Sequence, residues 1–134
     1  MIGVLILTHG TLGEALLRAA GHVLGSRPLR AEALGIAAGE SPEAFLGRTQ
    51  AALERVDAGQ GVLLLTDIFG ATPANVALKL LSDGRVEGVS GVNLPMLLRA
   101  LTHRTEPLPD VVAKAQEGAA EGIVHMNRDR CRTC

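Results

Sequence analysis

A histidine and an aspartate directly follow the two most apolar segments of this 134-residue chain. The run from Ile2 to Leu7 is typical of a strand buried on both faces, and Thr8-His9-Gly10 comes next. The run from Val62 to Thr66 has the same character, and Asp67 follows it. Ligands and reacting groups collect at the carboxyl ends of strands in open α/β sheets. If the two strands are neighbours, His9 and Asp67 face each other across one crevice.

This pair predicts chemistry at the histidine itself, since the pattern places no serine or cysteine nucleophile beside it. A carboxylate bonded to one imidazole nitrogen fixes the tautomer and leaves the other nitrogen as a nucleophile. Helix amino ends hold anions through free N–H groups, and the hydroxyls of Thr11 and Thr72 could add bonds. We therefore predict phosphoryl transfer through a phosphohistidine at His9. Two plainer interpretations stay open: His9 as a solvated loop residue, and Asp67 as the cap of a turn.

Strand and helix patterns alternate along the chain, which predicts an α/β fold with a doubly wound, mostly parallel sheet and helices on both faces. Strands are expected at 2–7, 30–37 (near an edge), 62–66, 86–92 and 123–126. Helices are expected at 12–24, after Ser41-Pro42, after Thr72-Pro73, after Asn93 and from Asp110 to about 121. The expected helix signals are a Thr11–Glu14 capping box, N-caps at Ser41, Thr72 and Asp110, and Gly25 beyond the first helix.

Composition excludes several other functions. The net charge is -1 and aromatic residues are nearly absent, so we expect no nucleic-acid binding. No apolar run approaches the ~20 residues of a membrane helix, and the opening residues predict no signal peptide, so we expect a cytoplasmic protein. Nucleotide-binding glycine motifs are absent or partial. Cys131 and Cys134 lack a second ligand pair, and His22, His103 and His125 show no partner, so we expect no metal and no cofactor.

Three segments together resemble the IIA domain of the mannose family of the bacterial phosphoenolpyruvate-dependent sugar phosphotransferase system. They are Ile6-Leu7-Thr8-His9-Gly10, Leu64 to Asn75 (which contains Thr66-Asp67-Ile68-Phe69-Gly70-Ala71-Thr72-Pro73), and Gly91-Val92-Asn93-Leu94-Pro95-Met96. The resemblance covers residues 1–126 and leaves 127–134 as a flexible polar tail.

The resemblance implies a role for each matching position. His9 matches the histidine phosphorylated by the phosphocarrier protein HPr, and Asp67 matches the aspartate that orients its ring. The implied phosphate-binding residues are Gly10, Thr11, Gly70, Ala71 and Thr72. The implied partner-docking residues are Phe69, Leu94, Pro95 and Met96. The family fold has four parallel strands plus a last antiparallel strand, exchanged across a homodimer in known members, for which 123–126 is the candidate.

The resemblance also implies partners, and it leaves alternatives. HPr would deliver phosphate, and a IIB component expected as a separate chain would receive it. Any membrane contact would be indirect, through a permease complex. The alternatives are the phosphotransfer subunit of a dihydroxyacetone kinase, a regulatory module switched by phosphorylation of His9, and, least favoured, a small-molecule-binding domain. The sugar cannot be inferred from this chain.

Overall fold

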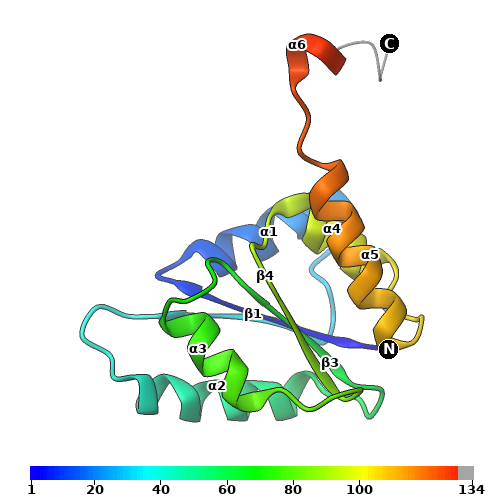
Figure 1. The fold of residues 1–134 in the computed structure, drawn as a ribbon. Coiled ribbons are helices and arrows are strands. Elements are labelled where there is room, and N and C mark those ends of the chain that lie inside the picture. The colour runs from blue at the N-terminus through cyan, green and yellow to red at the C-terminus, as the bar shows by residue number, and fades with distance from the viewer. Residues whose placement is uncertain (130–134) are drawn as a thin grey trace.

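Four parallel strands form the centre of the molecule, with helices on both faces (Figure 1). The computed structural model describes residues 1–129. The strands are β1 (Gly3–His9), β2 (Ala31–Ile36), β3 (Val62–Thr66) and β4 (Val86–Ser90). The helices are α1 (Leu12–Leu24), α2 (Pro42–Val56), α3 (Thr72–Leu80), α4 (Leu94–Thr102), α5 (Leu108–Glu121) and α6 (Met126–Asp129). The strand order is β2-β1-β3-β4, so the expected α/β sheet and its edge strand β2 are confirmed.

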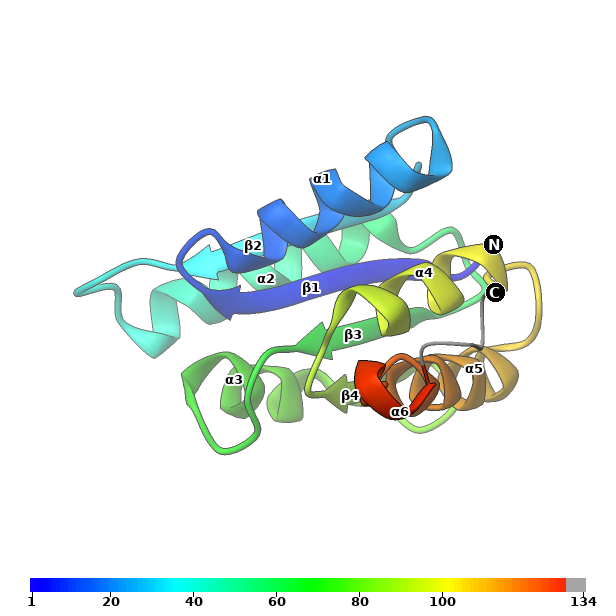
Figure 2. The same ribbon diagram turned by 90° about the horizontal axis from the view of Figure 1, so that it is seen from above.

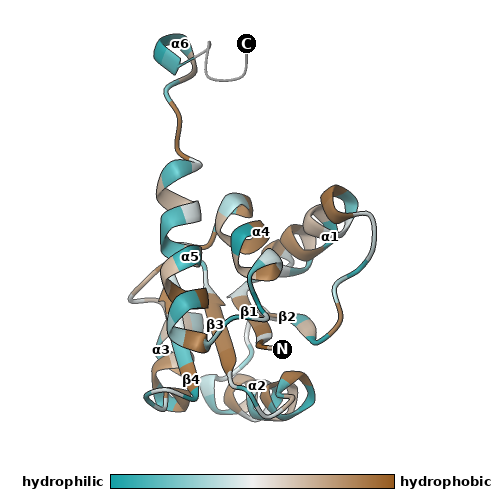
Figure 3. Cartoon of the chain, turned by 90° about the vertical axis from the view of Figure 1, so that its right-hand side faces the viewer, coloured by the Kyte–Doolittle hydropathy of each residue, from teal (hydrophilic) through white to brown (hydrophobic). Residues whose placement is uncertain are grey.

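The sheet divides the core into two layers because alternate strand residues face opposite sides. Val4, Ile6, Leu63 and Leu65 pack with α1, α4 and α5. Leu5, Leu7, Val62 and Leu64 pack with α2 and α3, around the fully buried ring of Phe45. Figure 2 shows α1, α4 and α5 above the sheet, and Figure 3 shows the brown, hydrophobic strands between the helical layers. Burial on both faces explains why β1 and β3 are continuous apolar runs in the sequence.

Helix α1 buries only part of the stripe that apolar periodicity predicts, which consists of Leu12, Leu16, Ala19, Ala20, Val23 and Leu24. Leu12, Val23 and Leu24 are exposed, whereas Gly13, Leu17 and Ala20 are buried. A Cβ on Gly13 would lie 3.2 Å from both Ile6 Cγ2 and Thr8 Oγ1, so the helix lies close to the sheet at this glycine. The buried face of α1 therefore includes a glycine that has no side chain. Apolar periodicity alone does not identify this face.

The predicted helix caps are confirmed at some helices and wrong at others. Ser41 Oγ accepts a hydrogen bond from Ala44 N, and Gly25 ends α1 with a φ of 89°, as expected. The Thr11–Glu14 capping box is wrong, because Thr11 has near-helical backbone angles and its side chain caps nothing. The buried Thr8 hydroxyl accepts the Gly13 N–H instead, at 2.9 Å.

The N-cap predictions at Thr72 and Asp110 are also wrong, each by a small shift along the chain. Thr72 is the first residue of α3, and Ala71 is its N-cap. Asp110 lies in the first turn of α5, whose N-cap is Pro107. Neither Ala71 nor Pro107 has a side-chain acceptor, so the first N–H groups of these two helices are not capped by a side chain.

The chain leaves the sheet after α5, and the antiparallel strand expected at 123–126 is not present. Residues 123–125 are irregular and lead to α6, which projects from the body (Figure 1). Ile123 and Met126 are 77% and 76% exposed. A strand needs a neighbouring strand to accept and donate its ladder hydrogen bonds, and within the described chain this segment meets none. Within residues 1–129, no helix is both long enough and apolar enough to cross a bilayer.

Candidate active site

His9 and Asp67 meet at the point where the sheet reverses its winding direction. Strands β1 and β3 are neighbours, with Gly3 opposite Val62 and Leu7 opposite Thr66. The helices that follow them, α1 and α3, lie on opposite faces of the sheet. Such a switch point opens a crevice outside the carboxyl ends of the two strands. The neighbour relation on which the sequence prediction depended is therefore confirmed.

The two side chains are in direct contact. His9 Nδ1 lies 2.8 Å from Asp67 Oδ2, and the main-chain N–H of His9 donates to the same oxygen at 2.9 Å. The His9 side chain is 54% exposed, while that of Asp67 is 13% exposed. An ionised carboxylate can only accept, so Nδ1 carries the proton in this contact. Nε2 is then the nitrogen with the free lone pair, on a ring that solvent and partners can reach.

Asp67 is held on both sides, and its environment favours the charged form. Its Oδ1 accepts the Ile68 N–H at 2.9 Å, and its main-chain carbonyl accepts the Gly91 N–H at 2.9 Å. Burial raises the pKa of Asp67, but the hydrogen bonds from the His9 main chain, the His9 ring and Ile68 outweigh it, so the pKa lies below its usual value. Asp67 is thus a fixed anion that orients the ring of His9.

A shallow pocket of about 400 Å³ lies beside this ring. Its lining residues are His9, Gly10, Ile36, Ala37, Ala38 and Thr72. The structure thus brings three of the expected residues, His9, Gly10 and Thr72, to one cavity. Gly70 and Ala71 lie in the turn before α3, and Thr11 is the N-cap of α1, so these three flank the cavity without lining it. Ala71 follows a tight turn over Phe69 and Gly70. Within residues 1–129, no main-chain acceptor takes the N–H groups of Gly70, Thr72 or Ala74.

One wall of the pocket is formed by Ile36 to Ala38, and the sequence analysis did not predict it. It follows the edge strand β2, where the main chain approaches the turn after His9 very closely. A Cβ on Gly35 would lie 1.6 Å from Gly10 O, and Gly10 N donates to Ile36 O at 3.1 Å. A glycine inside a strand often marks a close backbone approach, so Gly35 was the available signal.

The expected docking residues have very different exposures. Phe69 is 70% exposed and follows Ile68, which is 60% exposed. Leu94 and Pro95 are half-buried, and Met96 is only 2% exposed within the core, which removes its side chain from any docking surface. The segment has a structural role: Asn93 Oδ1 caps α4 through Met96 N. Pro95 packs where a Cβ on Gly122 would come within 2.4 Å of it.

The remaining histidines lie outside this pocket. His22 and His125 are exposed. The expectation that His103 has no carboxylate partner is wrong, since its Nδ1 contacts Glu106 Oε2 three residues on. No group of three or more His, Cys, Asp or Glu side chains in residues 1–129 is arranged to hold a metal ion. Cys131 and Cys134 lie outside the described residues.

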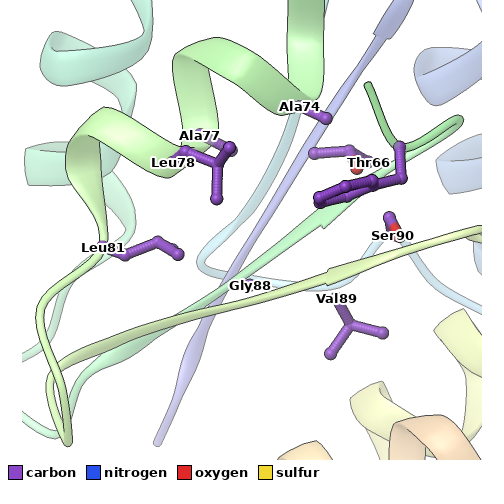
Figure 4. A pocket seen from close by; sticks show the side chains of 9 residues that line it. Thr66, Ala74, Ala77, Leu78, Leu81, Gly88, Val89 and Ser90 are labelled. Atoms are coloured by element: carbon purple, nitrogen blue, oxygen red, sulfur yellow. The ribbon is translucent and has the colours of Figure 1, made fainter. Parts of the chain in front are cut away.

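A second cavity, of about 100 Å³, lies between α3 and β4. Figure 4 shows Leu78, Leu81 and Val89 around it. Phe69 also lines it, so it adjoins the loop that carries Asp67. Its other lining residues are small, apolar or hydroxyl-bearing, and none titrates. This cavity therefore offers apolar contacts and no acid, base or nucleophile.

Comparisons with known proteins identify the family. The family model described as "PTS system fructose IIA component" matches residues 3–116. The chain is 34% identical over 125 residues to the PTS system mannose-specific EIIAB component of Escherichia coli K12, covering 91% of this chain and 38% of that protein. It is 35% identical over 105 residues to the PTS system fructose-specific EIIA component of Bacillus subtilis, covering 78% of this chain and 71% of that protein. The chain thus spans about two fifths of the E. coli relative.

Solved structures agree with these matches. The phosphotransferase system component EIIA from Streptococcus agalactiae has a TM-score of 0.85 at 29% identity, covering 96% of this chain and 99% of that one. The PTS IIA protein associated with the fucose utilization operon of Streptococcus pneumoniae has a TM-score of 0.77 at 27% identity, covering 95% and 94%. The resemblance inferred from the three sequence segments is confirmed: this chain belongs to the IIA family of the phosphotransferase system that includes the mannose- and fructose-specific components.

Proposed function

We propose that the chain is a phosphocarrier that takes a phosphoryl group on His9 from the phosphohistidine of HPr and passes it to a IIB component. The observation that carries the proposal is the contact of His9 Nδ1 with Asp67 Oδ2 at 2.8 Å on a half-exposed ring. A buried ring could not meet another protein, and a free-swinging ring would not present one nitrogen. The contact combines access with orientation.

In the proposed step, the Nε2 lone pair of His9 attacks phosphorus while the N–P bond in the donor histidine breaks. The donor keeps the electron pair of that bond. The His9 ring becomes cationic as the new bond forms, and Asp67 stabilises this charge through the Nδ1–H bond. Onward transfer is the reverse of this step, with the acceptor on IIB attacking the same phosphorus. No proton has to leave Nδ1 in either direction.

The phosphoryl oxygens need hydrogen-bond donors that are not already in use. The N–H groups of Gly70 and Thr72 meet this condition, Ala71 lies between them, and Thr72 lines the pocket. They stand at the amino end of α3, where the helix dipole favours an anion. On the other side, Gly10 lines the pocket; its N–H is bonded to Ile36 O, so it contributes open space without a side chain and no hydrogen bond. Thr11 opens α1. We assign these five residues to the phosphoryl group.

The proposal includes the assembly in which the protein works. HPr is the donor and a IIB component is the acceptor. Contact with the membrane is indirect, through a permease complex, so we place the protein in the cytoplasm. The family resemblance is our reason for adding a homodimer to the proposal. Residues 1–126 would form the IIA domain, with 127–134 as its tail. Phe69, Leu94 and Pro95 are the docking residues that remain after the burial of Met96. The family matches favour this carrier over a dihydroxyacetone kinase subunit, a phosphorylation-switched module or a small-molecule-binding domain.

The test is phosphorylation by phosphoenolpyruvate, enzyme I and HPr, read by mass spectrometry at alkaline pH. We expect one phosphoryl group on wild type and none on His9→Ala. The exposed His22 in α1 supplies the matched control, and His22→Ala should be labelled like wild type. Asp67→Asn should be labelled about tenfold more slowly, since a neutral hydrogen bond replaces a charge-assisted one. Label retained in His9→Ala would refute the site.

A further inference from the structure

The pocket wall from Ile36 to Ala38 continues into a four-residue turn, Ala37 to Glu40. Glu40 N donates to Ala37 O at 3.0 Å, and Gly39 has a φ of 80°. The Glu40 side chain folds back over the turn, where its Oε1 accepts the Ala37 N–H at 3.1 Å. Ala37 and Ala38 are exposed and bury no apolar anchor. Backbone hydrogen bonding and one carboxylate are therefore what define the shape of this wall.

Arg48 of α2 holds that carboxylate in a fork. Its Nε donates to Glu40 Oε2 at 2.9 Å, and one Nη donates to Oε1 at 2.8 Å. The same Nη donates to Gly35 O at 2.9 Å, at the end of β2. The guanidinium lies over the fully buried ring of Phe45, 5.3 Å from its centroid. A bidentate pair seated on a core side chain has one geometry, which it imposes on the turn.

A second bidentate ion pair on α2, Arg55–Glu32, provides a comparison for Arg48–Glu40. Arg55, also on α2, forms a fork with Glu32 on β2, with distances from 2.9 to 3.2 Å. It ties α2 to β2, as Arg48 does through Gly35 O, and the two arginines are similarly exposed, but neither Arg55 nor Glu32 lines the His9 pocket. If forks between α2 and β2 served stability alone, the two would be equivalent. Only Arg48–Glu40 bonds to a residue that lines the pocket, Ala37.

We propose that Arg48 and Glu40 are positioning residues for phosphoryl transfer, holding the turn 37–40 as a preformed wall against which the donor protein's phosphohistidine docks. The inference rests on the proposed function of His9. It extends the working site by a pair of residues that touches neither the ring nor Asp67. The loop that carries the wall extends beyond the carboxyl ends of the strands, next to the turn after β1 (Figure 2).

Loss of the Arg48–Glu40 ion pair should weaken the binding of phosphorylated HPr more than it slows phosphoryl transfer within the complex. Without Arg48 the turn keeps its main-chain bond and its Glu40–Ala37 bond, but it loses the link to α2. A wall that moves must be ordered when the donor binds, which raises the apparent KM for phosphorylated HPr. The His9–Asp67 contact lies on β1 and β3 and does not depend on the fork. The rate within the bound complex should therefore stay close to that of wild type.

The test compares Arg48→Met with Arg55→Met in rapid-quench transfer from phosphorylated HPr. Methionine keeps an apolar stem and removes the fork in both variants. We expect Arg48→Met to raise KM by about threefold to tenfold with kcat changed less than about twofold, while Arg55→Met matches wild type. Arg48→Lys, which keeps the charge but not the fork, should fall between Arg48→Met and wild type. Backbone NMR should show changed shifts at Ala37 in Arg48→Met and unchanged shifts at Asp67.

The outcomes separate this inference from the function beneath it. If wild type takes no label from HPr, the proposed function fails, and the positioning role fails with it. If wild type is labelled but Arg48→Met and Arg55→Met have equal KM values, His9 remains the acceptor and the positioning role is refuted. Equal loss of stability in both variants, measured by urea unfolding, together with a KM change confined to Arg48→Met would support the role.

Discussion

Replacing Gly35 by alanine is the sharpest available test of how the sheet edge shapes the site. An alanine Cβ would stand 1.6 Å from Gly10 O and 2.6 Å from Gly10 C. Both are backbone atoms, so no side-chain rotation can relieve the clash. The two segments would have to separate by roughly 1.5 to 2 Å to reach ordinary contact. Gly10 immediately follows His9, so the displacement begins one residue from the reacting ring.

The cost can be worked from the bonds that this separation strains. Overpacking a closely packed site costs about 1 to 3 kcal/mol, and losing the hydrogen bond from Gly10 N to Ile36 O costs about 1 kcal/mol more. We expect Gly35→Ala to lose about 2 to 4 kcal/mol of unfolding free energy. A shift near 1 Å at the ring can slow a reaction by about a hundredfold. Because Asp67 still holds the ring, we expect kcat/KM to fall by about tenfold to a hundredfold.

The opposite edge strand supplies a matched control. Gly88 lies in β4, and a Cβ there would meet Leu81 Cδ2 at 3.0 Å, a side-chain tip that can move aside. Gly88→Ala should stay within about 1 kcal/mol of wild type and transfer phosphate normally. Urea unfolding and rapid-quench transfer from phosphorylated HPr measure both quantities. If Gly35→Ala proved as stable and as active as Gly88→Ala, the close approach of Gly35 to Gly10 would have no role in shaping the site.

Two further predictions concern Asp67 and Thr8. Because the pKa of Asp67 is lowered in the folded protein, its stabilising effect is complete above the ordinary aspartate pKa and is lost as pH falls through the lowered value. The stability difference between wild type and Asp67→Asn in urea should therefore shrink between pH 7 and about pH 3; a constant difference would contradict the assignment. Thr8→Val should lose about 1 to 3 kcal/mol, because it leaves the Gly13 N–H without its acceptor in a buried place. Stability equal to wild type would mean that another group caps α1.

The prediction that His9 and Asp67 face each other has a simple physical basis, and their contact confirms it. Both residues follow strands buried on both faces, and such strands are continuous apolar runs that cannot be confused with amphipathic helices of this length. Polar residues at the end of such a run must lie beyond the carboxyl end of the strand, outside the apolar core. The remaining condition was strand order, which local patterns do not contain. The sequence analysis therefore left the neighbour relation of the two strands as a condition, and the structure meets it.

The missed features all depend on contacts between distant segments. Ala37 and Ala38 carry no reactive group, so composition gives them no role until the fold places them beside His9. The buried face of α1 was predicted incorrectly because Gly13, which lacks a side chain, lies close to the sheet. Thr8, and not Thr11, caps the first turn of α1, because the buried Thr8 hydroxyl needs a hydrogen-bond partner and the Gly13 N–H supplies one. The strand expected at 123–126 needs an edge to pair with, and the described chain offers that segment none.

The absence of a cation at the pocket bears on what the site is built to do. Among the described residues, no lysine or arginine lines the cavity beside His9, and Arg48 behind its wall is already paired with Glu40. The donors on offer are main-chain N–H groups and hydroxyls, which hold a phosphoryl group by direction more than by net charge. A carrier must take the group up and give it away again, so binding that is too strong in the phosphorylated state would only slow its release. A site of main-chain amides, hydroxyls and one oriented ring suits the proposed carrier, because neither uptake nor release of the phosphoryl group should then cost much free energy.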